Sequence, residues 1–305
     1  MPITLPDLSG RTAVVTGASD GVGVEIVRGL AGAGADVVLP VRNRAKGERA
    51  IARIRETQPD ARLSLRDLDL ARLDSVAALA DALRSERAPV DLLVLNAGIV
   101  LLGDPERHVT DDGFELHFQT NFLGHFALTT ALLPVLRERR ARVVVQCSLA
   151  AAVSRVDWGD LASARRYRPL RAYGASKVAL GLFACELARR SATEDWGVSV
   201  QLSHPGVAPD TAIAPALRAR AGKGLQRAVA QHVGNTPAQA AEPALLASIA
   251  PAVAGAPDLF GPSGPLHFGG PAARQRPYRR ISDPAAGARM WAVAEQLLAE
   301  RVRPA

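Results

Sequence analysis

The chain has 305 residues, of which 48% are hydrophobic and 4% aromatic, and its formal net charge is +7. This length suits one large domain or two small ones. Aromatic residues are too scarce for base-stacking platforms, and the arginines are interrupted by acidic and apolar residues, so no nucleic-acid partner is expected.

Metal, disulfide and membrane signals are missing from the sequence. Cys147 and Cys185 both fall in apolar runs, without metal-ligand spacing or a disulfide framework. The N-terminal residues lack a basic-then-apolar signal pattern, and no apolar run approaches the ~18 residues that span a bilayer. We therefore expect a cytoplasmic protein with no transmembrane segment and no metal site. Four histidines without ligand spacing are interpreted as structural or surface residues: His108, His117, His125 and His204.

The first two thirds of the chain alternate short apolar runs with amphipathic stretches. In chain order we expect a strand at 12–16, a helix at 22–33, a strand at 36–41, a helix at 44–56, a strand at 62–65, a helix at 73–84, a strand at 91–95, a helix at 112–137, a strand at 142–147, a helix at 172–190 and a strand at 198–202. Strands that are apolar throughout and alternate with helices are typical of a parallel sheet covered on both faces. Right-handed crossovers then predict a Rossmann-like doubly wound α/β fold, with its ligand crevice beyond the carboxyl ends of the strands.

The last third departs from this alternation. Residues 207–262 are rich in Ala and Pro with weak periodicity, and we expect them to form a helical substrate lid within the same single domain, 1–305. An edge strand is expected at 266–268 and a terminal helix at 290–302. The segment 269–285, with its many Arg and Pro residues, is expected to be irregular and to begin a C-terminal extension, 269–305.

A glycine-rich turn, T-G-A-S-D-G-V-G at 16–23, lies between the first strand and the first helix. Glycines at such a turn let a pyrophosphate approach the backbone N–H groups at the helix N-terminus. The spacing is G-x-x-x-G-x-G, not the commoner G-x-G-x-x-G, so a turn with packing value only stays an alternative. The candidate nucleotide contacts are Gly17, Ser19, Asp20, Gly21, Val22 and Gly23.

Tyr173 and Lys177 are four residues apart on a predicted helix, so they share one face of it. A phenol has an unperturbed pKa of about 10, too high for proton transfer near neutral pH. An ammonium one turn away favours the phenolate, and we expect Lys177 to lower the pKa of Tyr173. The pair alone is a weak signal, because both residue types are common on solvated helix faces.

Further motifs in the same order strengthen the signal. Asn96-Ala97-Gly98 follows the fourth strand, Asn121 lies in the long helix and Ser148 follows the fifth strand. With the glycine turn and the Tyr/Lys pair, these residues resemble the single-domain type of the short-chain dehydrogenase/reductase family over residues 8–210. The stretch 148–170 resembles the subgroup of retinol dehydrogenases and WW-domain oxidoreductases. Leu95 departs from the commoner N-N-A-G motif, which is expected to affect packing only.

The resemblance implies a role for each catalytic candidate. Tyr173 would be the general acid that protonates the developing alkoxide, or the base in oxidation. Lys177 would lower the pKa of Tyr173 and hydrogen-bond the nicotinamide ribose. Ser148 would hold the substrate oxygen, and Asn121 would order a water that links Lys177 to solvent. The plainer alternatives are a strand-end hydroxyl for Ser148 and a helix-interior polar residue for Asn121.

The end of the second strand bears on the cofactor. An acidic residue there would bind the ribose 2′-hydroxyl, whereas this chain has Arg42, which suits a 2′-phosphate. Arg42 therefore favours NADP(H). Asp20 mildly opposes a second negative charge nearby, so NAD(H) stays the alternative. The further cofactor contacts that the resemblance implies are Asp69, Leu70, Asn96, Ala97, Gly98, Tyr173, Lys177, Pro205, Gly206 and Val207.

The sequence thus predicts an NADP-dependent oxidoreductase that interconverts a carbonyl and an alcohol on a lipophilic small molecule, acting as a ketone or aldehyde reductase. One alternative is a non-catalytic NAD(P)-binding sensor or partner subunit, a class that often lacks the Tyr, Lys or Ser. Another is an epimerase or dehydratase of the extended branch, which the glycine spacing disfavours. The resemblance also implies a homodimer through the helices at 112–137 and 172–190, although the subgroup includes monomers.

Overall fold

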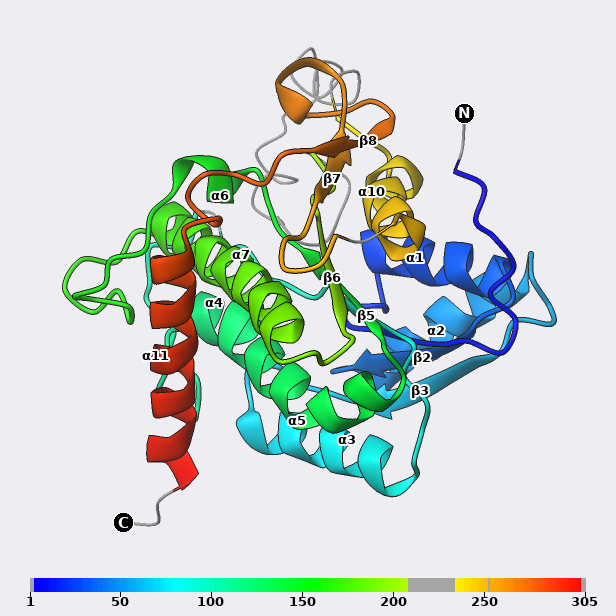
Figure 1. The fold of residues 1–305 in the computed structure, drawn as a ribbon, viewed down its shortest axis with the longest axis horizontal. Coiled ribbons are helices and arrows are strands. Elements are labelled where there is room, and N and C mark those ends of the chain that lie inside the picture. Colours follow the sequence, from blue (N-terminus) through cyan, green and yellow to red (C-terminus); the bar gives the residue numbers. More distant parts are fainter. Residues whose placement is uncertain (1–2, 102, 208–233, 252, 303–305) are drawn as a thin grey trace.

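One sheet organises the molecule. The computed structural model describes residues 3–101, 103–207, 234–251 and 253–302. Within these residues the strands follow the order β3-β2-β1-β4-β5-β6-β7-β8 (Figure 1). Neighbouring strands run parallel except β7 and β8, which are antiparallel. The strands are β1 (Thr12–Val15), β2 (Asp36–Val41), β3 (Leu63–Asp67), β4 (Leu92–Leu95), β5 (Arg142–Gln146), β6 (Ser199–Ser203), β7 (Leu259–Pro262) and β8 (Ala272–Gln275).

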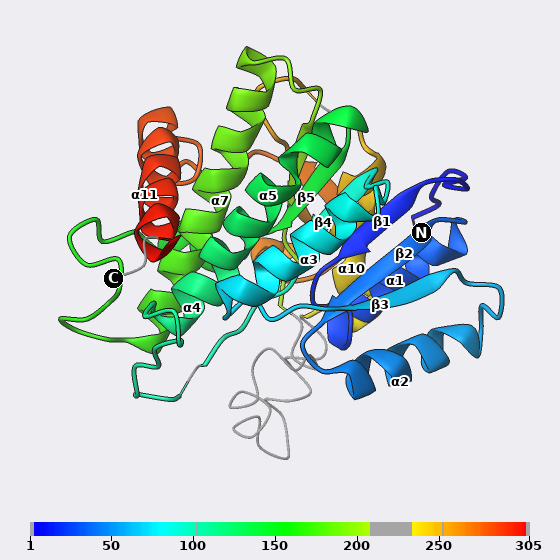
Figure 2. The same cartoon turned by 90° about the horizontal axis from the view of Figure 1, so that it is seen from below.

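Helices cover both faces of this sheet. They are α1 (Gly21–Gly32), α2 (Arg44–Arg55), α3 (Leu73–Ser85), α4 (Leu116–Phe118), the π-helical turn η1 (Gln119–Leu123), α5 (Gly124–Glu138), α6 (Ala150–Val153), α7 (Pro169–Thr193), α10 (Pro237–Ile249), the 3₁₀ turn η2 (Pro265–His267) and α11 (Pro284–Val302). Helices α1, α2 and α10 pack on one face, and α3, α5 and α7 on the other (Figure 2).

Successive strand residues face opposite layers, as a doubly covered sheet requires. In β1, Ala13 and Val15 pack with the α1 and α10 layer, whereas Val14 packs with the α5 and α7 layer. The predicted doubly wound α/β fold is therefore confirmed. Most predicted elements up to residue 203 begin and end within a few residues of the observed ones.

The long helix predicted at 112–137 starts later than expected and is not uniform. It begins at Leu116, and the π-helical turn Gln119–Leu123 interrupts it before α5. Gly113 has a φ of +87°, a conformation that belongs to a turn and not to a helix. The predicted helix at 172–190 extends from Pro169 to Thr193. Its earlier start is explained by Pro169, because proline suits the first turn of a helix.

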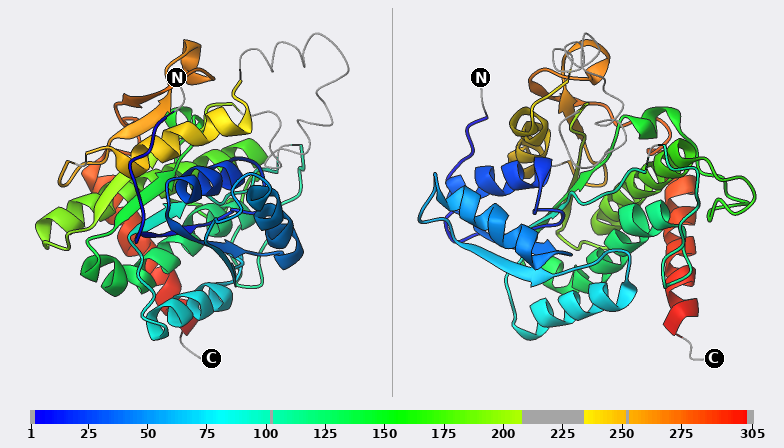
Figure 3. Two further views of the ribbon diagram at one scale, coloured as in Figure 1. Left: turned by 90° about the vertical axis from the view of Figure 1, so that its right-hand side faces the viewer. Right: turned by 180° about the vertical axis from the view of Figure 1, so that it is seen from behind.

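Part of the expected lid, 207–262, belongs instead to the core, and this boundary was wrong. Helix α10 packs against α1, and β7 extends the sheet beside β6 (Figure 3). The buried side of α10 consists largely of alanines, which give little hydrophobic periodicity yet allow two helices to approach closely. Residues 208–233 of that interval lie outside the described residues.

Two further expectations for the last third were also wrong. Leu266 and His267 have positive φ values of 53° and 59°, which exclude a strand, and 265–267 forms a short turn where an edge strand was expected. The edge strand is β8, within the segment expected to be irregular, and it is defined by pairing with β7. The terminal helix begins at Pro284, six residues before the predicted start at 290.

Candidate active site

The glycine turn after β1 is shaped to bring backbone close to a ligand. A Cβ on Gly17, whose φ is +68°, would lie 2.7 Å from Ala97 Cα, and a Cβ on Gly23 would collide with the Gly17 carbonyl oxygen. Asp20 caps α1 by accepting a hydrogen bond of 2.7 Å from Gly21 N. The turn therefore requires glycine at both positions, and the N-terminus of α1 opens onto it.

A cleft of about 420 Å³ lies above this turn, at the carboxyl ends of the strands. Twelve of the candidate nucleotide contacts line it: Gly17, Ser19, Asp20, Gly21, Val22, Gly23, Arg42, Asp69, Leu70, Asn96, Ala97 and Gly98. The cleft is also lined by residues that the sequence motifs do not indicate, namely Pro40, Val41, Asn43, Lys46, Leu68, Ile99, Val100, Leu101 and Thr120. The lining residues extend from β2 to the loop after β4, so the cleft is elongated and fits an extended ligand.

The end of the cleft beside β2 is basic. Arg42 and Lys46 both line it, and within the described part of the chain neither forms an ion pair. Asn43 caps α2 by accepting a hydrogen bond of 2.9 Å from Lys46 N, which fixes the start of the helix. Arg44, by contrast, is engaged with Asp67 at 3.0 Å. The sequence signal for Lys46 was its place one turn beyond Arg42.

Below the cleft, side chains join the ends of β1 and β4. Thr16 Oγ1 accepts hydrogen bonds from Asn96 N and Ala97 N, each at 3.0 Å. The Asn96 side chain donates to Thr16 O at 2.9 Å. Gln146 connects the end of β5 to this hydrogen-bond network, because its side-chain amide donates to Asn96 Oδ1 at 3.4 Å. This network holds the glycine turn and the Asn96-Ala97-Gly98 segment in fixed register.

Asn121 lies in the π-helical turn η1 and is fully buried. Its side chain pairs with both backbone groups of Ile99: Oδ1 accepts from Ile99 N at 2.8 Å, and Nδ2 donates to Ile99 O at 3.0 Å. Nδ2 also donates to Ser176 Oγ at 2.9 Å. Single π-helical turns often mark functional positions, and this one connects the loop after β4 to helix α7.

Tyr173 and Lys177 lie on α7 next to the end of β5. Burial raises the pKa of Tyr173 to about 12, against a lowering effect of the hydrogen bond with Ser148. Burial lowers the pKa of Lys177 to about 8, and its Nζ donates to Gln146 O at 3.1 Å. The expected lowering of the Tyr173 pKa by Lys177 is therefore not observed, because desolvation of the phenol outweighs the hydrogen bond with Ser148.

Ser148 has the contact of a strand-end serine and also reaches Tyr173. Its hydroxyl accepts a hydrogen bond of 3.2 Å from Ala150 N at the start of α6, as a strand-end serine would. The same hydroxyl acts on Tyr173, whose pKa it lowers by hydrogen bonding. The loop after β5 and the first turns of α7 thus bring the serine and tyrosine side chains together.

A buried Glu/His pair beside Tyr173 was not anticipated as part of the site. Glu115 accepts from His117 Nδ1 at 2.8 Å and from the backbone N of His117 and Phe118 at 3.0 and 2.7 Å. His117 Nε2 accepts from Leu101 N at 3.1 Å. The His117 ring packs edge-on against the Tyr173 ring, with centroids 6.2 Å apart. His117 is therefore structural, as expected, but it supports both the tyrosine and the cleft loop.

The segment Pro205–Val207 follows β6 and is not part of the cleft lining. Gly206 has a φ of +73°, and a Cβ there would collide with the Phe268 carbonyl oxygen, which also accepts from Val207 N at 2.8 Å. His204 Nδ1 accepts from Gly206 N at 3.3 Å, and burial lowers the pKa of His204 to about 4. The segment is thus fixed by the turn that follows β7.

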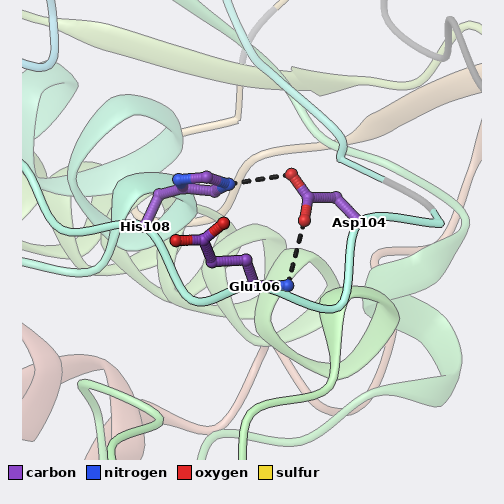
Figure 4. Close-up of side chains that lie close together, drawn as sticks. All are labelled: Asp104, Glu106 and His108. Atoms are coloured by element: carbon purple, nitrogen blue, oxygen red, sulfur yellow. Dashed lines mark hydrogen bonds and ion pairs between the residues drawn. The ribbon is translucent and has the colours of Figure 1, made fainter.

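Asp104, Glu106 and His108 form a cluster on the loop after β4 (Figure 4). Their ligand atoms all lie within 4.8 Å of one another. Asp104 accepts from Glu106 N at 2.9 Å and pairs with His108 at 2.8 Å, and the hydrogen bond to Asp104 raises the pKa of His108. These hydrogen bonds explain why the three residues lie together: they form a surface ion pair that stabilises the loop.

Residues 11–222 match the sequence model described as short chain dehydrogenase. The chain belongs to this family. A Mus musculus polyprenol dehydrogenase is 41% identical over 211 residues, which are 68% of this chain and 62% of the relative. The Mus musculus retinol dehydrogenase 12 is 39% identical over 201 residues, which are 66% of this chain and 62% of the relative. The predicted retinol dehydrogenase-like subgroup is confirmed.

The matched part of this short chain dehydrogenase spans 62% of the length of these curated relatives. Solved structures show the same fold over more of the chain. An uncharacterized protein from Mycobacterium Paratuberculosis has a TM-score of 0.77 and 32% identity, covering 96% of this chain and 95% of that one. The Pseudomonas aeruginosa RhlG/NADP active-site complex has a TM-score of 0.65 and 27% identity, covering 83% and 97%. Among the described residues of this dehydrogenase, no helix is both long and apolar enough to cross a membrane.

Proposed function

We propose that this short chain dehydrogenase interconverts a carbonyl and an alcohol on a lipophilic small molecule with NADP(H), and that it acts as a reductase. The proposal is carried by the surroundings of Gly98, which lines the cleft: a Cβ there would lie 3.2 Å from both Asn121 Oδ1 and Lys177 Nζ. Tyr173, one turn before Lys177 on α7, is hydrogen-bonded to Ser148, and the far end of the cleft holds Arg42. The relatives are named for polyprenol and retinol, which are apolar alcohols, and this supports a lipophilic substrate.

The cleft suits a dinucleotide. Gly17 and Gly23 leave a cradle that a Cβ would fill, so a pyrophosphate can approach the backbone at the N-terminus of α1. Asp69 and Leu70 line the part of the cleft near β3, where an adenine would lie. Arg42 and Lys46 provide two cations at the end of β2 and the start of α2, which supports NADP(H) over NAD(H).

In this proposal, the nicotinamide supplies or accepts the hydride. The Tyr173 hydroxyl donates a proton to the substrate oxygen, while the Ser148 hydroxyl hydrogen-bonds the same oxygen and orients it. Burial raises the pKa of Tyr173 to about 12, so the phenol is protonated at neutral pH, and the hydrogen bond with Ser148, which lowers this pKa, favours release of the proton. This charge state favours the reductive direction. Lys177, buried within one turn of Tyr173, would bind the nicotinamide ribose.

Replacing Tyr173 with Phe tests the mechanism. The Tyr173→Phe variant should lose turnover by roughly 10²- to 10⁴-fold, the range for general acid catalysis, while its affinity for NADPH stays unchanged. NADPH consumption with a panel of apolar ketones and aldehydes measures the first quantity, and a fluorescence titration measures the second.

Tyr167 offers a matched control, because its hydroxyl is buried without a hydrogen-bond partner in the described structure and no Lys lies four residues beyond it. Tyr167→Phe should retain activity. Full activity of Tyr173→Phe would contradict the mechanism. NADPH binding by the unaltered protein without turnover of any carbonyl would favour the non-catalytic sensor instead. The cytoplasmic location stays a prediction of the sequence.

A further inference from the structure

His125 is a buried titratable residue that the proposed mechanism does not use. It lies in the first turn of α5, one turn after Asn121, and is fully buried. Nδ1 is 3.1 Å from the Asn121 carbonyl oxygen, and Nε2 is 3.1 Å from Thr16 Oγ1. A single side chain therefore contacts both the π-helical turn and the residue that begins the glycine turn.

The partners determine the tautomer of His125. A carbonyl oxygen only accepts hydrogen bonds, so Nδ1 must carry the proton. Nε2 is then a bare acceptor, and the Thr16 hydroxyl donates its proton to Nε2 at 3.1 Å in preference to the Val94 carbonyl oxygen, which is 3.3 Å away. Burial lowers the pKa of His125 to about 3, so the ring is neutral. Thr16 Oγ1 in turn accepts from Asn96 N and Ala97 N, and every polar atom in this group is used.

The hydrogen bonds continue to the catalytic tyrosine. From Asn121, Nδ2 donates to Ser176 Oγ at 2.9 Å, and Ser176 Oγ donates to Tyr173 O at 2.7 Å. The side chains of Thr16, Asn121, His125 and Ser176 are all fully buried. A continuous buried chain thus connects the glycine turn beneath the cofactor cleft with the backbone of the turn of α7 that carries Tyr173.

We propose that His125 is a positioning residue that couples these two parts of the site. It holds the Asn121 carbonyl in the π-helical turn with one ring nitrogen and the glycine turn with the other. Because buried polar groups that lose their partners are costly, removal of the ring disturbs both ends at once. The inference rests on the proposed function for its kinetic consequences, whereas the geometry and the cofactor affinity can be tested without turnover.

Three substitutions separate the two contacts. His125→Leu removes both and should lower NADPH affinity and kcat, each by roughly 10-fold to 100-fold, the range for unpairing a buried polar group. His125→Asn places an amide near the position of Nδ1 and should restore kcat more than affinity. His125→Gln places an amide near the position of Nε2 and should restore NADPH affinity more than kcat.

Thr129 provides the matched control. It lies one turn later in α5, is fully buried, and its hydroxyl donates only to the His125 carbonyl at 2.8 Å. Thr129→Val should leave kcat and NADPH affinity unchanged. If Thr129→Val lowers both values as much as His125→Leu, the effect is general loosening of α5, and the proposal is overturned.

A spectroscopic measurement on the unaltered protein needs neither turnover nor a folded variant. Nitrogen NMR of the labelled imidazoles should show His125 as the Nδ1–H tautomer, with no titration between pH 5 and 8. An Nε2–H tautomer, or a ring that titrates in this range, would overturn the proposal. If no carbonyl is turned over, the proposed function fails, but the tautomer and the NADPH titrations of the variants still decide the role of His125.

Discussion

At the scale of single residues, burial determines the charge states in the site. Desolvation disfavours the charged form of any group, so it raises the pKa of the Tyr173 phenol and lowers the pKa of the Lys177 ammonium. Near neutral pH the tyrosine is therefore a neutral donor, and Lys177, with a pKa of about 8, is still mainly protonated. Reduction needs this combination, because the acid must be protonated before each turnover.

In the proposed function, Arg42 at the end of β2 and Lys46 in the first turn of α2 favour NADP(H) over NAD(H). Arg42→Ala should weaken NADPH binding by about 10-fold to 100-fold, the range for a charged hydrogen bond, and should leave NADH binding unchanged, because only NADPH bears the 2′-phosphate. Separate fluorescence titrations with the two cofactors measure this difference.

Arg44 is a suitable control two residues away, because it is exposed and paired with Asp67 outside the cleft lining. Arg44→Ala should bind NADPH as the unaltered protein does. If Arg42→Ala weakens NADH and NADPH equally, the residue contributes to general binding and not to phosphate recognition.

At the scale of elements, glycine substitutions in α1 can test how closely α10 packs against α1. Gly29 of α1 faces α10, and a Cβ there would lie 2.7 Å from Leu245 Cδ1, whereas a Cβ on Gly32 would meet only the flexible end of Gln58. Both Ala substitutions gain about 0.5–1 kcal/mol of helix propensity. Overpacking at Gly29 costs about 1–3 kcal/mol. Gly29→Ala should therefore lower the free energy of unfolding, and Gly32→Ala should not.

Urea unfolding of the two variants measures this difference directly. Equal stability of Gly29→Ala and Gly32→Ala would indicate that α10 can move away from α1, as a mobile lid would. The expected result instead places α10 among the elements that open only with the whole sheet.

Sequence patterns predicted those elements whose own residues determine them. The strands β1, β2, β4 and β5 are mostly apolar runs, and β3 and β6 alternate apolar with polar residues. Right-handed crossovers between such strands predict one fold, so the glycine turn, Asn96, Ser148 and Tyr173 could be placed at one edge of the sheet in advance. Strand β8 has no apolar alternation and exists only by pairing with β7. The π-helical turn has no local sequence signature, and the role of His125 depends on Thr16, which is 109 residues away in the chain. Such features depend on tertiary contacts.

At the scale of the whole molecule, the terminal helix covers a surface that the sequence prediction assigned to a dimer. Helix α11 lies along α7 (Figure 1). Trp291 of α11 packs against Phe126 of α5 and Phe183 of α7, with ring centroids 5.0 and 5.9 Å apart. The Arg190 guanidinium lies 4.4 Å from the centre of the Trp291 ring. The outer side of α7 is thus occupied by the same chain.

We expect the protein to be a monomer, because a partner helix cannot reach the side of α7 that α11 covers. Light scattering coupled to size-exclusion chromatography measures the mass. Removal of residues 284–305 should expose this apolar surface and produce dimers or larger aggregates. A stable dimer of the intact chain would contradict the expectation.

The packing of α10 and β7 also has a consequence for synthesis. The family match ends at residue 222, yet the apolar cluster around α1 is completed by Ala240, Ala244, Leu245 and Phe260, and the open edge of β6 is covered only by β7. A nascent chain that has left the ribosome up to the end of the family match would still expose that cluster and that strand edge. We therefore expect the part of the chain that matches the family to complete its folding only after the last third of the chain has been synthesised. Until then, the exposed apolar cluster and strand edge are a defined surface for a chaperone to bind.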